Sequence, residues 1–332
     1  MKRVVRLLGV GLLLLVVLLL ILFVLAQTTP LISAQDEHAV WLRLLITAIV
    51  ICLLSMCIFF LFSFRQNEAS TISLYAQPTD IKEINTEQPN YASLLTIYLR
   101  DRYGPFWRRK VRLLLVTGEP EQAEAIAPGL TGQHWLEGDH TVLIYGGRPT
   151  AEPDVTLLTA LKKLRRSRPL DGIIWALTEE QSRQTAQLDK GWRGLINGGK
   201  RLGFQAPLYL WQVCDDGDYQ TGRPLQSVGC LLPERCTPEQ LAVMLEAQTL
   251  PLTEQGMSQL LTDNRHDFLL RLAHTLAERG IAHWQTVLKP LLAGGAFSSL
   301  RLRGLMFSPP LAAVPEAAPH AWLPSPVWAG VT

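Results

Sequence analysis

The stretch LLLVTGEPEQAEAI, residues 113–126, joins a run of apolar residues to a segment that reads as the start of a helix. The apolar run ends at Gly118. A buried strand, a glycine and a helix in this order are typical of a phosphate-binding loop. The second half of this loop is acidic, however, where such loops are basic. The stretch therefore indicates an α/β fold and raises the question of whether its loop holds a nucleotide.

A P-loop follows the pattern G-x-x-x-x-G-K-[ST]. Laid from Gly118, this chain has Ala123 at the second glycine, Glu124 at the lysine and Ala125 at the hydroxyl that binds magnesium. Two unit charges about 4 Å apart interact by roughly 4 kcal/mol at an effective dielectric of about 20, so glutamate turns the attraction to a phosphate into repulsion. We therefore expect no nucleotide hydrolysis, no cofactor and no metal at this loop.

The same loop has a purely structural interpretation. Gly118 would only turn the chain, while Glu119, Glu121 and Glu124 would stabilise a helix N-terminus through the helix dipole. On the loop alone, this structural interpretation is preferred.

Beyond the loop, short apolar runs alternate with helical segments. The runs are bounded by turn residues, as in a parallel sheet covered on both faces. We expect a three-layer α/β domain over residues 91–236, entered through a short amphipathic helix. The expected strands are 111–117, 141–145, 171–177 and 207–213, and the expected helices are 91–104, 153–166 and 178–202, the last ended by Gly203.

After Cys236 the pattern becomes helical. Thr237 and Gln240 form a capping box, with proline at the first helical position. Helical stripes follow, so we expect a helical extension over residues 237–308. The tail, 309–332, is rich in proline and alanine, and we expect it to be disordered.

Two uncharged apolar segments precede the domain, at residues 7–26 and 44–64. Each is long enough to cross a bilayer as a helix, which takes about 20 residues. They predict a transmembrane hairpin over residues 1–65 and a polar linker over 66–90. Basic residues flank the hairpin on one side, so the N-terminus and the main domain are expected in the cytoplasm. Removal of the first span as a signal peptide would not change this location.

The 332-residue chain has a formal net charge of +2, which gives no argument for nucleic-acid binding. Cys52 and Cys57 lie in the second predicted span. Cys214, Cys230 and Cys236 lack a zinc-binding spacing, and we expect them to be free thiols in or near the core.

The stretch LRLRGLMFSP, residues 300–309, carries an arginine-glycine pair followed by Phe307 and Ser308. It resembles the signature of the IcmF/TssM family, inner-membrane proteins of type VI secretion systems with relatives in type IVB systems. The family opens with a transmembrane hairpin, continues into a cytoplasmic GTPase-like domain of the P-loop NTPase kind, and has a helical extension that ends at the signature. The resemblance therefore covers the order of elements along essentially the whole chain.

The resemblance also implies where the nucleotide motifs would lie. Family members with an intact loop have glycine, lysine and threonine at the three loop positions that are changed here. In place of their D-T-A-G-R-Y motif this chain keeps Gly147 and Arg148 but has Tyr145 instead of the aspartate. In place of their guanine-reading T-K-x-D motif it keeps Asp215 but has Val213 instead of the lysine. The joint loss points to a pseudo-NTPase.

By resemblance, the chain is expected to be a structural component of a type VI secretion complex in the bacterial inner membrane, without catalysis. The implied partners are a TssL-like inner-membrane subunit, further copies of the chain, and the baseplate proteins of the contractile tail. Family proteins usually continue into a third span and a large periplasmic region, which residues 309–332 do not contain. Two alternatives stay open: an active ATP- or GTP-binding subunit that transduces energy, and a membrane-anchored assembly factor unrelated to secretion.

Other polar groups have bland explanations. Three carboxylates in a turn more often cap a helix than bind a metal, and the histidines of the helical part lack an H-E-x-x-H spacing. No nucleophile is paired with a base, and no catalytic residue is expected. These groups are Asp215, Asp216 and Asp218, and His266, His274 and His283.

A basic cluster near the end of the helix at 153–166 has two interpretations. It would pair with the helix dipole, or it would form a patch for an acidic protein partner or an anionic lipid. Its members are Lys162, Lys163, Arg165, Arg166 and Arg168.

Overall fold

A computed structural model describes residues 91–214, 222–312 and 319–331. The predicted hairpin (1–65) and linker (66–90) lie outside this range. Within the described residues, no helix is both long enough and apolar enough to cross a membrane.

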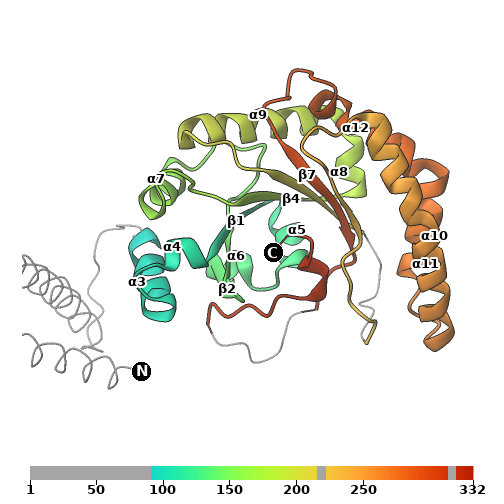
Figure 1. The fold of residues 1–332 in the computed structure, drawn as a ribbon, viewed down its shortest axis with the longest axis horizontal. Helices are drawn as coiled ribbons and strands as arrows, with labels where there is room; N and C mark the ends of the chain where they lie inside the picture. Colours follow the sequence, from blue (N-terminus) through green and yellow to red (C-terminus); the bar gives the residue numbers. More distant parts are fainter. Residues whose placement is uncertain (1–90, 215–221, 313–318, 332) are drawn as a thin grey trace, which may run out of the picture. The chain divides into compact units, whose positions relative to one another are not determined.

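The described chain is built on a seven-stranded mixed sheet (Figure 1). Five strands are parallel, and an antiparallel strand closes each edge. In spatial order the strands are β2 (Trp135–Gly138), β3 (Thr141–Tyr145), β1 (Arg112–Thr117), β4 (Gly172–Thr178), β5 (Leu208–Val213), β7 (Leu302–Ser308) and β6 (Gly229–Leu231).

The four predicted strands are confirmed as β1, β3, β4 and β5, each within one residue of the expected bounds. The prediction of a wholly parallel sheet is wrong, because β2 and β6 pair antiparallel with their neighbours. β2 turns into β3 through Asp139 and His140, whose φ angles of 42° and 60° suit a two-residue hairpin turn. Both edge strands are too short to give a pattern in sequence.

Helices α3 (Tyr91–Tyr103), α7 (Val155–Leu164) and α9 (Thr185–Leu202) cover one face of the sheet (Figure 1). Trp192 of α9 meets Trp175 of β4 edge to face, with ring centroids 4.5 Å apart. The helix expected over 178–202 is divided: α8 (Glu179–Arg183) begins in a capping box at Thr178 and ends before α9 starts. Gly203 ends α9 in the left-handed conformation, as predicted. A short helix, α4 (Trp107–Lys110), leads into β1.

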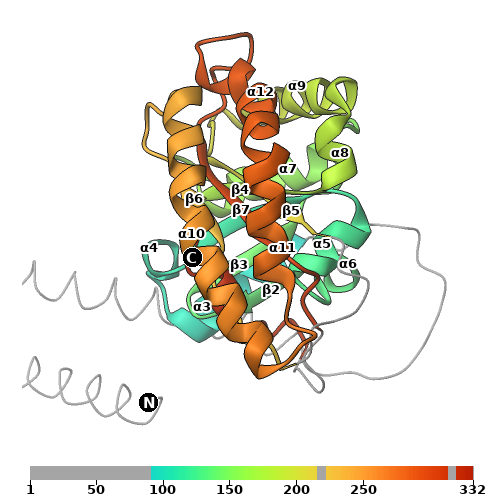
Figure 2. The same ribbon diagram turned by 90° about the vertical axis from the view of Figure 1, so that its right-hand side faces the viewer.

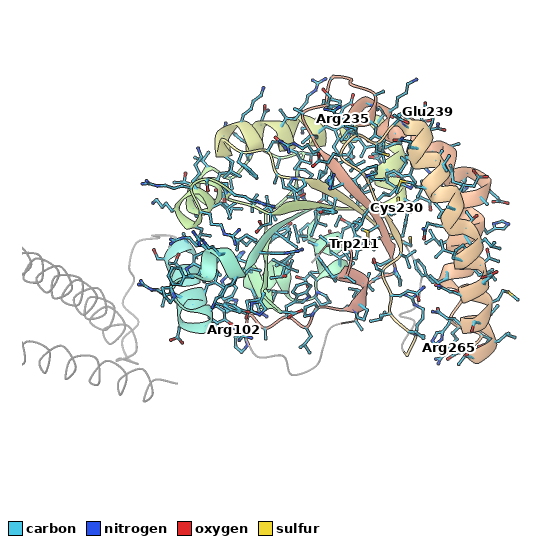
Figure 3. The ribbon with its side chains drawn as sticks, viewed as in Figure 1. Arg102, Trp211, Cys230, Arg235, Glu239 and Arg265 are labelled. Carbon is cyan, nitrogen blue, oxygen red and sulfur yellow. The ribbon has the colours of Figure 1, made fainter. Side chains whose placement is uncertain are left out.

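The opposite face is covered by α5 (Pro120–Ile126), α6 (Leu130–Gln133) and the C-terminal segment 319–331. The expected disorder of the tail is wrong for these last residues. Trp322 and Trp328 are buried there. The ring centroid of Trp328 lies 4.6 Å from that of Trp211 in β5, and Trp211 lies in the interior of the domain (Figure 3). The segment includes a short 3-10 helix, η2 (Pro326–Trp328). Its tryptophans cover the sheet where the short α5 and α6 leave it open.

A helical excursion lies between β6 and β7: α10 (Pro238–Thr262), α11 (Phe268–Thr275), the π-helix η1 (Leu276–Gly280) and α12 (Ile281–Leu292). The capping box of Thr237 and Gln240 at the start of α10 is confirmed. Figure 2 shows these helices side by side at one end of the domain. The helical extension expected over 237–308 needs correction at its end. Residues Leu302–Ser308 of the signature form strand β7, which lies between β5 and β6 in the sheet. Side chains of β7 are buried on both faces of the sheet, as in a central strand.

Candidate functional site

The loop after β1 lies at the carboxyl edge of the parallel strands, where open α/β sheets bind ligands. Gly118 is the first residue of this loop and has a φ of +150°. A Cβ atom at Gly118 would lie 2.5 Å from the carbonyl oxygen of Ala176 in β4. Real Cβ atoms do not approach a carbonyl oxygen so closely. Glycine is therefore required by the packing of two strands, whether or not a ligand binds.

The loop is closed by contacts within the protein. The Gly118 N–H donates to the Gly147 carbonyl oxygen at 3.1 Å, and the Tyr145 hydroxyl donates to the Gly118 carbonyl oxygen at 3.2 Å. Burial raises the pKa of the Tyr145 phenol, with further contributions from nearby carboxylates. Pro120, at the start of α5, has no N–H to offer an anion. Two backbone donors of the loop are therefore unavailable to a phosphate: the Gly118 N–H is bonded within the protein, and Pro120 has no N–H.

The Glu124 side chain does not face the space that a phosphate would occupy. Its carboxylate accepts the backbone N–H of Gly129 at 2.6 Å and that of Thr131 at 2.7 Å, together with the Thr131 hydroxyl. Glu124 therefore satisfies the free donors at the start of α6. The role of the Glu124 carboxylate is therefore to bind the start of α6, which differs from the predicted repulsion of a phosphate.

The two alanines of the loop are parts of the packing. Ala123 is fully buried in the core beneath α5. The Ala125 carbonyl oxygen accepts the N–H of Leu311 at 2.6 Å, which ties α5 to the chain that leaves β7.

The Gly147–Arg148 pair lies beside the loop and contacts it. Arg148 Nε forms an ion pair with Glu119 Oε2 at 2.5 Å. Val213 is buried at the end of β5. Asp215, the base-reading candidate, lies outside the described residues, as do Asp216 and Asp218.

A serine and a histidine lie in contact, a pair for which no sequence motif provides a signal. Ser182 Oγ lies 2.8 Å from His283 Nε2 and also donates to the Glu179 carbonyl oxygen at 2.6 Å. Because that donation uses the serine proton, His283 is the donor in the pair. Ser182 is fully buried, so a substrate cannot reach it. The pair is a structural link between α8 and α12.

The remaining histidines and the cysteines fit the expectations. His266 is buried at the rim of the helices, and the exposed His274 lies 3.3 Å from Glu278. Cys214, Cys230 and Cys236 are free and lie in or near the core. Burial raises the pKa of both Cys214 and Cys230 to about 12, so these thiols stay protonated and unreactive.

The signature in β7 is mostly explained by packing. Ser308 Oγ accepts the indole N–H of Trp211 at 2.8 Å, and Phe307 meets Trp284 of α12 edge to face. A Cβ atom at Gly304 would lie 2.9 Å from the ring of Tyr209. Arg303 differs from the other signature residues because it lies at a break in the register of β5 and β7, where Leu208 pairs with Leu302 but Tyr209 pairs with Gly304. Such bulges redirect a side chain.

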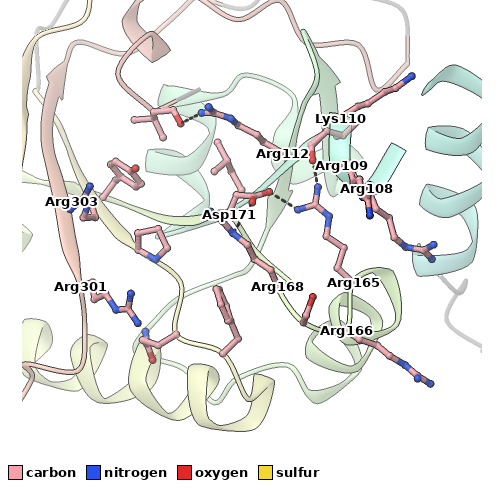
Figure 4. A pocket seen from close by; sticks show the side chains of 18 of the residues that line it. Arg108, Arg109, Lys110, Arg112, Arg165, Arg166, Arg168, Asp171, Arg301 and Arg303 are labelled. Carbon is pink, nitrogen blue, oxygen red and sulfur yellow. Dashed lines mark hydrogen bonds and ion pairs between the residues drawn. The ribbon is translucent and has the colours of Figure 1, made fainter. Parts of the chain in front are cut away.

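Arg303 lines a cavity of about 1140 Å³ at the amino edge of the sheet, opposite the loop (Figure 4). Part of the predicted basic cluster lines it too, since Arg165, Arg166 and Arg168 belong to its wall, whereas Lys162 and Lys163 do not. The other basic residues come from 108–112 and 301–303. The sequence alone does not predict that these three segments meet, because they are brought together only by the pairing of β1, β4, β5 and β7.

A third feature is an apolar stripe on the outer side of α10. Its side chains are between 46% and 84% exposed, and their spacing of seven, seven and four residues places them on one face of the helix. The stripe consists of Val243, Leu250, Met257 and Leu261.

Comparisons with protein-family models, with curated proteins and with solved structures found no match to this chain.

Proposed function

We propose that the chain is a structural inner-membrane component of a type VI secretion complex. In this proposal an N-terminal transmembrane hairpin anchors it, and a degenerate P-loop-NTPase-like domain in the cytoplasm docks other subunits without hydrolysing nucleotide. The resemblance to the IcmF/TssM family supports the assignment to secretion. The partners are a TssL-like subunit, further copies of the chain, and the baseplate.

The closed loop after β1 is the observation that supports a non-catalytic domain. A phosphate there would have to displace Gly147 from the Gly118 N–H and the Tyr145 hydroxyl from the Gly118 carbonyl oxygen. Glu124, at the position of the P-loop lysine, is held by α6. These contacts support a loop after β1 that lacks the amide cradle and the P-loop lysine used in phosphoryl transfer.

Phosphate release from ATP and GTP by the purified full chain tests this part of the proposal. We expect no release above that of a heat-denatured sample. Steady turnover that is lost in Arg148→Gln, beside the loop, but kept in Arg193→Gln, on the exposed side of α9, would refute the scaffold proposal in favour of an active enzyme.

The apolar stripe of α10 supports protein docking. Large aliphatic side chains are more often buried than exposed, and four exposed ones share this face of α10. The stripe runs from Val243 to Leu261, a rise of about 27 Å along the helix, which is long enough for a partner helix to pack along it. We assign this face to the companion inner-membrane subunit.

Co-purification with the secretion subunits from detergent extracts tests the docking face. Leu250→Glu with Leu261→Glu should abolish recovery of the TssL-like subunit without lowering the thermal midpoint, because both side chains are exposed. Leu323→Glu, at an equally exposed leucine outside α10, is the matched control and should leave recovery intact. Failure of the unaltered chain to recover any secretion subunit would favour an unrelated assembly factor.

A further inference from the structure

The cavity at the amino edge of the sheet holds an excess of positive charge. Among its described lining residues are nine cationic side chains and two carboxylates. The cations come from three segments, 108–112, 165–168 and 301–303. Like charges gathered in one cavity repel each other unless an anion offsets them.

Little of this charge is neutralised within the protein. Asp171 is already engaged: its carboxylate lies 2.7 Å from Arg165 Nη1 and 3.0 Å from Arg168 Nε, and it accepts the backbone N–H of Leu113. The other carboxylate, Glu234, is exposed. Seven more cationic side chains line the same cavity.

Two of the guanidinium groups that line the cavity carry buried nitrogens without a hydrogen-bond partner, namely Nε of Arg165 and Nη1 of Arg303. The Arg165 side chain is only 10% exposed, and it is held in place by Asp171 and the Val111 carbonyl oxygen. Arg303 lies at the bulge in β7. Buried donors are normally satisfied, so these two unpartnered nitrogens add to the cost of the positive charge that a nearby anion would offset.

Figure 4 shows how these side chains are arranged. Arg165 and Arg112 extend toward the middle of the site, and the latter donates to the Val331 carbonyl oxygen at 3.4 Å. Arg166 and Lys110 extend outward. Arginine predominates over lysine in the lining. The planar fork of arginine binds phosphate oxygens in pairs, which a lysine ammonium does not.

We propose that this cavity is a binding site for a small anion that carries phosphate groups. A phosphate monoester brings up to about two negative charges in a compact group, so it offsets the excess charge better than single carboxylates do. The cavity volume is close to that of small-molecule sites. Tyr209 and Phe204 add apolar surface for the remainder of the ligand. The anion is either a soluble polyphosphate or the headgroup of an anionic phospholipid.

This inference goes beyond the scaffold function and does not depend on it. It places anion binding at the amino edge of the strands, whereas a P-loop would bind at the carboxyl edge. Nucleotide binding without hydrolysis would therefore be compatible with a closed loop, provided that it depends on the cavity arginines.

The test uses the full chain in phosphatidylcholine nanodiscs. Calorimetric titration with inorganic pyrophosphate measures soluble anions, and co-sedimentation with phosphatidylglycerol vesicles measures a bilayer source. We expect binding in at least one arm, weakened by about tenfold or more in Arg301→Gln with Arg303→Gln, because each change removes charge-assisted hydrogen bonds. Arg148→Gln, at the opposite edge of the sheet, is the matched control and should bind as the unaltered chain does.

Thermal midpoints show whether the double variant is folded. If it is not, Arg301→Gln alone serves, because the Arg301 side chain is exposed. Binding in the vesicle arm alone assigns the site to a lipid headgroup, and binding to pyrophosphate alone assigns it to a soluble ligand. Absence of binding in both arms, or full binding by the folded cavity variant, overturns the proposal.

Discussion

Gly118 lies where the carboxyl end of β1 meets β4, and this contact sets the shape of the loop. The sequence identified the residue correctly as a turn between a strand and a helix. It could not identify Ala176 as the neighbour, because the two residues are distant in sequence and meet only through the pairing of β1 and β4. The same limit applies to Glu124, whose partners are the N-cap residue Gly129 and Thr131 in the first turn of a four-residue helix that has no sequence pattern.

Gly118→Ala should destabilise the protein by about 1–3 kcal/mol, because the new methyl group meets the Ala176 carbonyl oxygen and the backbone is strained. Gly198→Ala on α9 is the matched control. Its added methyl group would meet nothing within 4 Å, so it should be neutral or raise stability by up to about 1 kcal/mol. Denaturant unfolding measures both, and equal effects would contradict the described loop geometry.

His283 should make stability depend on pH. Burial lowers the pKa of this imidazole in the folded protein, and the charge of Arg183 lowers it further, against the opposite effect of Glu179. The unfolded chain therefore binds a proton at His283 more readily than the folded protein does. The stability contributed by the neutral His283 is complete above pH 6.5 and is lost as the pH falls through the folded pKa.

Denaturant midpoints at about pH 7.5 and about pH 5.5 measure this effect. The difference between them should shrink in His283→Gln and persist in His274→Gln, the exposed matched histidine. An unchanged difference in His283→Gln would mean that another group is responsible.

At the scale of elements, the long apolar runs were predictable and the edges of the sheet were not. β1, β3, β4 and β5 follow from four uninterrupted runs, and the start of α10 follows from its capping box. β7 is not predictable from the apolar pattern, because Arg303 and Gly304 interrupt it. Proline and alanine dominate the composition of the C-terminal segment and so predict a disordered tail, although its tryptophans are buried against the sheet.

Trp328→Ala should lower stability by about 3–5 kcal/mol, because this fully buried ring fills the face between Trp211 and Trp322, and its indole N–H donates to the Ile126 carbonyl oxygen. Leu323→Ala, five residues earlier and largely exposed, is the control and should change stability little. If the two variants unfold at the same denaturant concentration, the segment does not cover the sheet.

At the scale of the whole molecule, the two edges of the parallel strands have opposite characters. The carboxyl edge, where a nucleotide would bind, is closed by Gly147, Tyr145 and Glu119 with Arg148. The amino edge carries the basic cavity. The chain as a whole has a net charge of only +2, so composition gave no sign of this separation. It arises because strand pairing gathers arginines from distant segments at one end of the sheet.

The closure of the loop after β1 is the feature on which a non-catalytic role depends most. A structure of the full chain determined with GTP and magnesium tests it directly. We predict that the Gly118 N–H stays bonded to the Gly147 carbonyl oxygen and that any nucleotide density lies among Arg165, Arg301 and Arg303. Density for a triphosphate in the loop from Gly118 to Glu124, with Tyr145 displaced, would contradict the account.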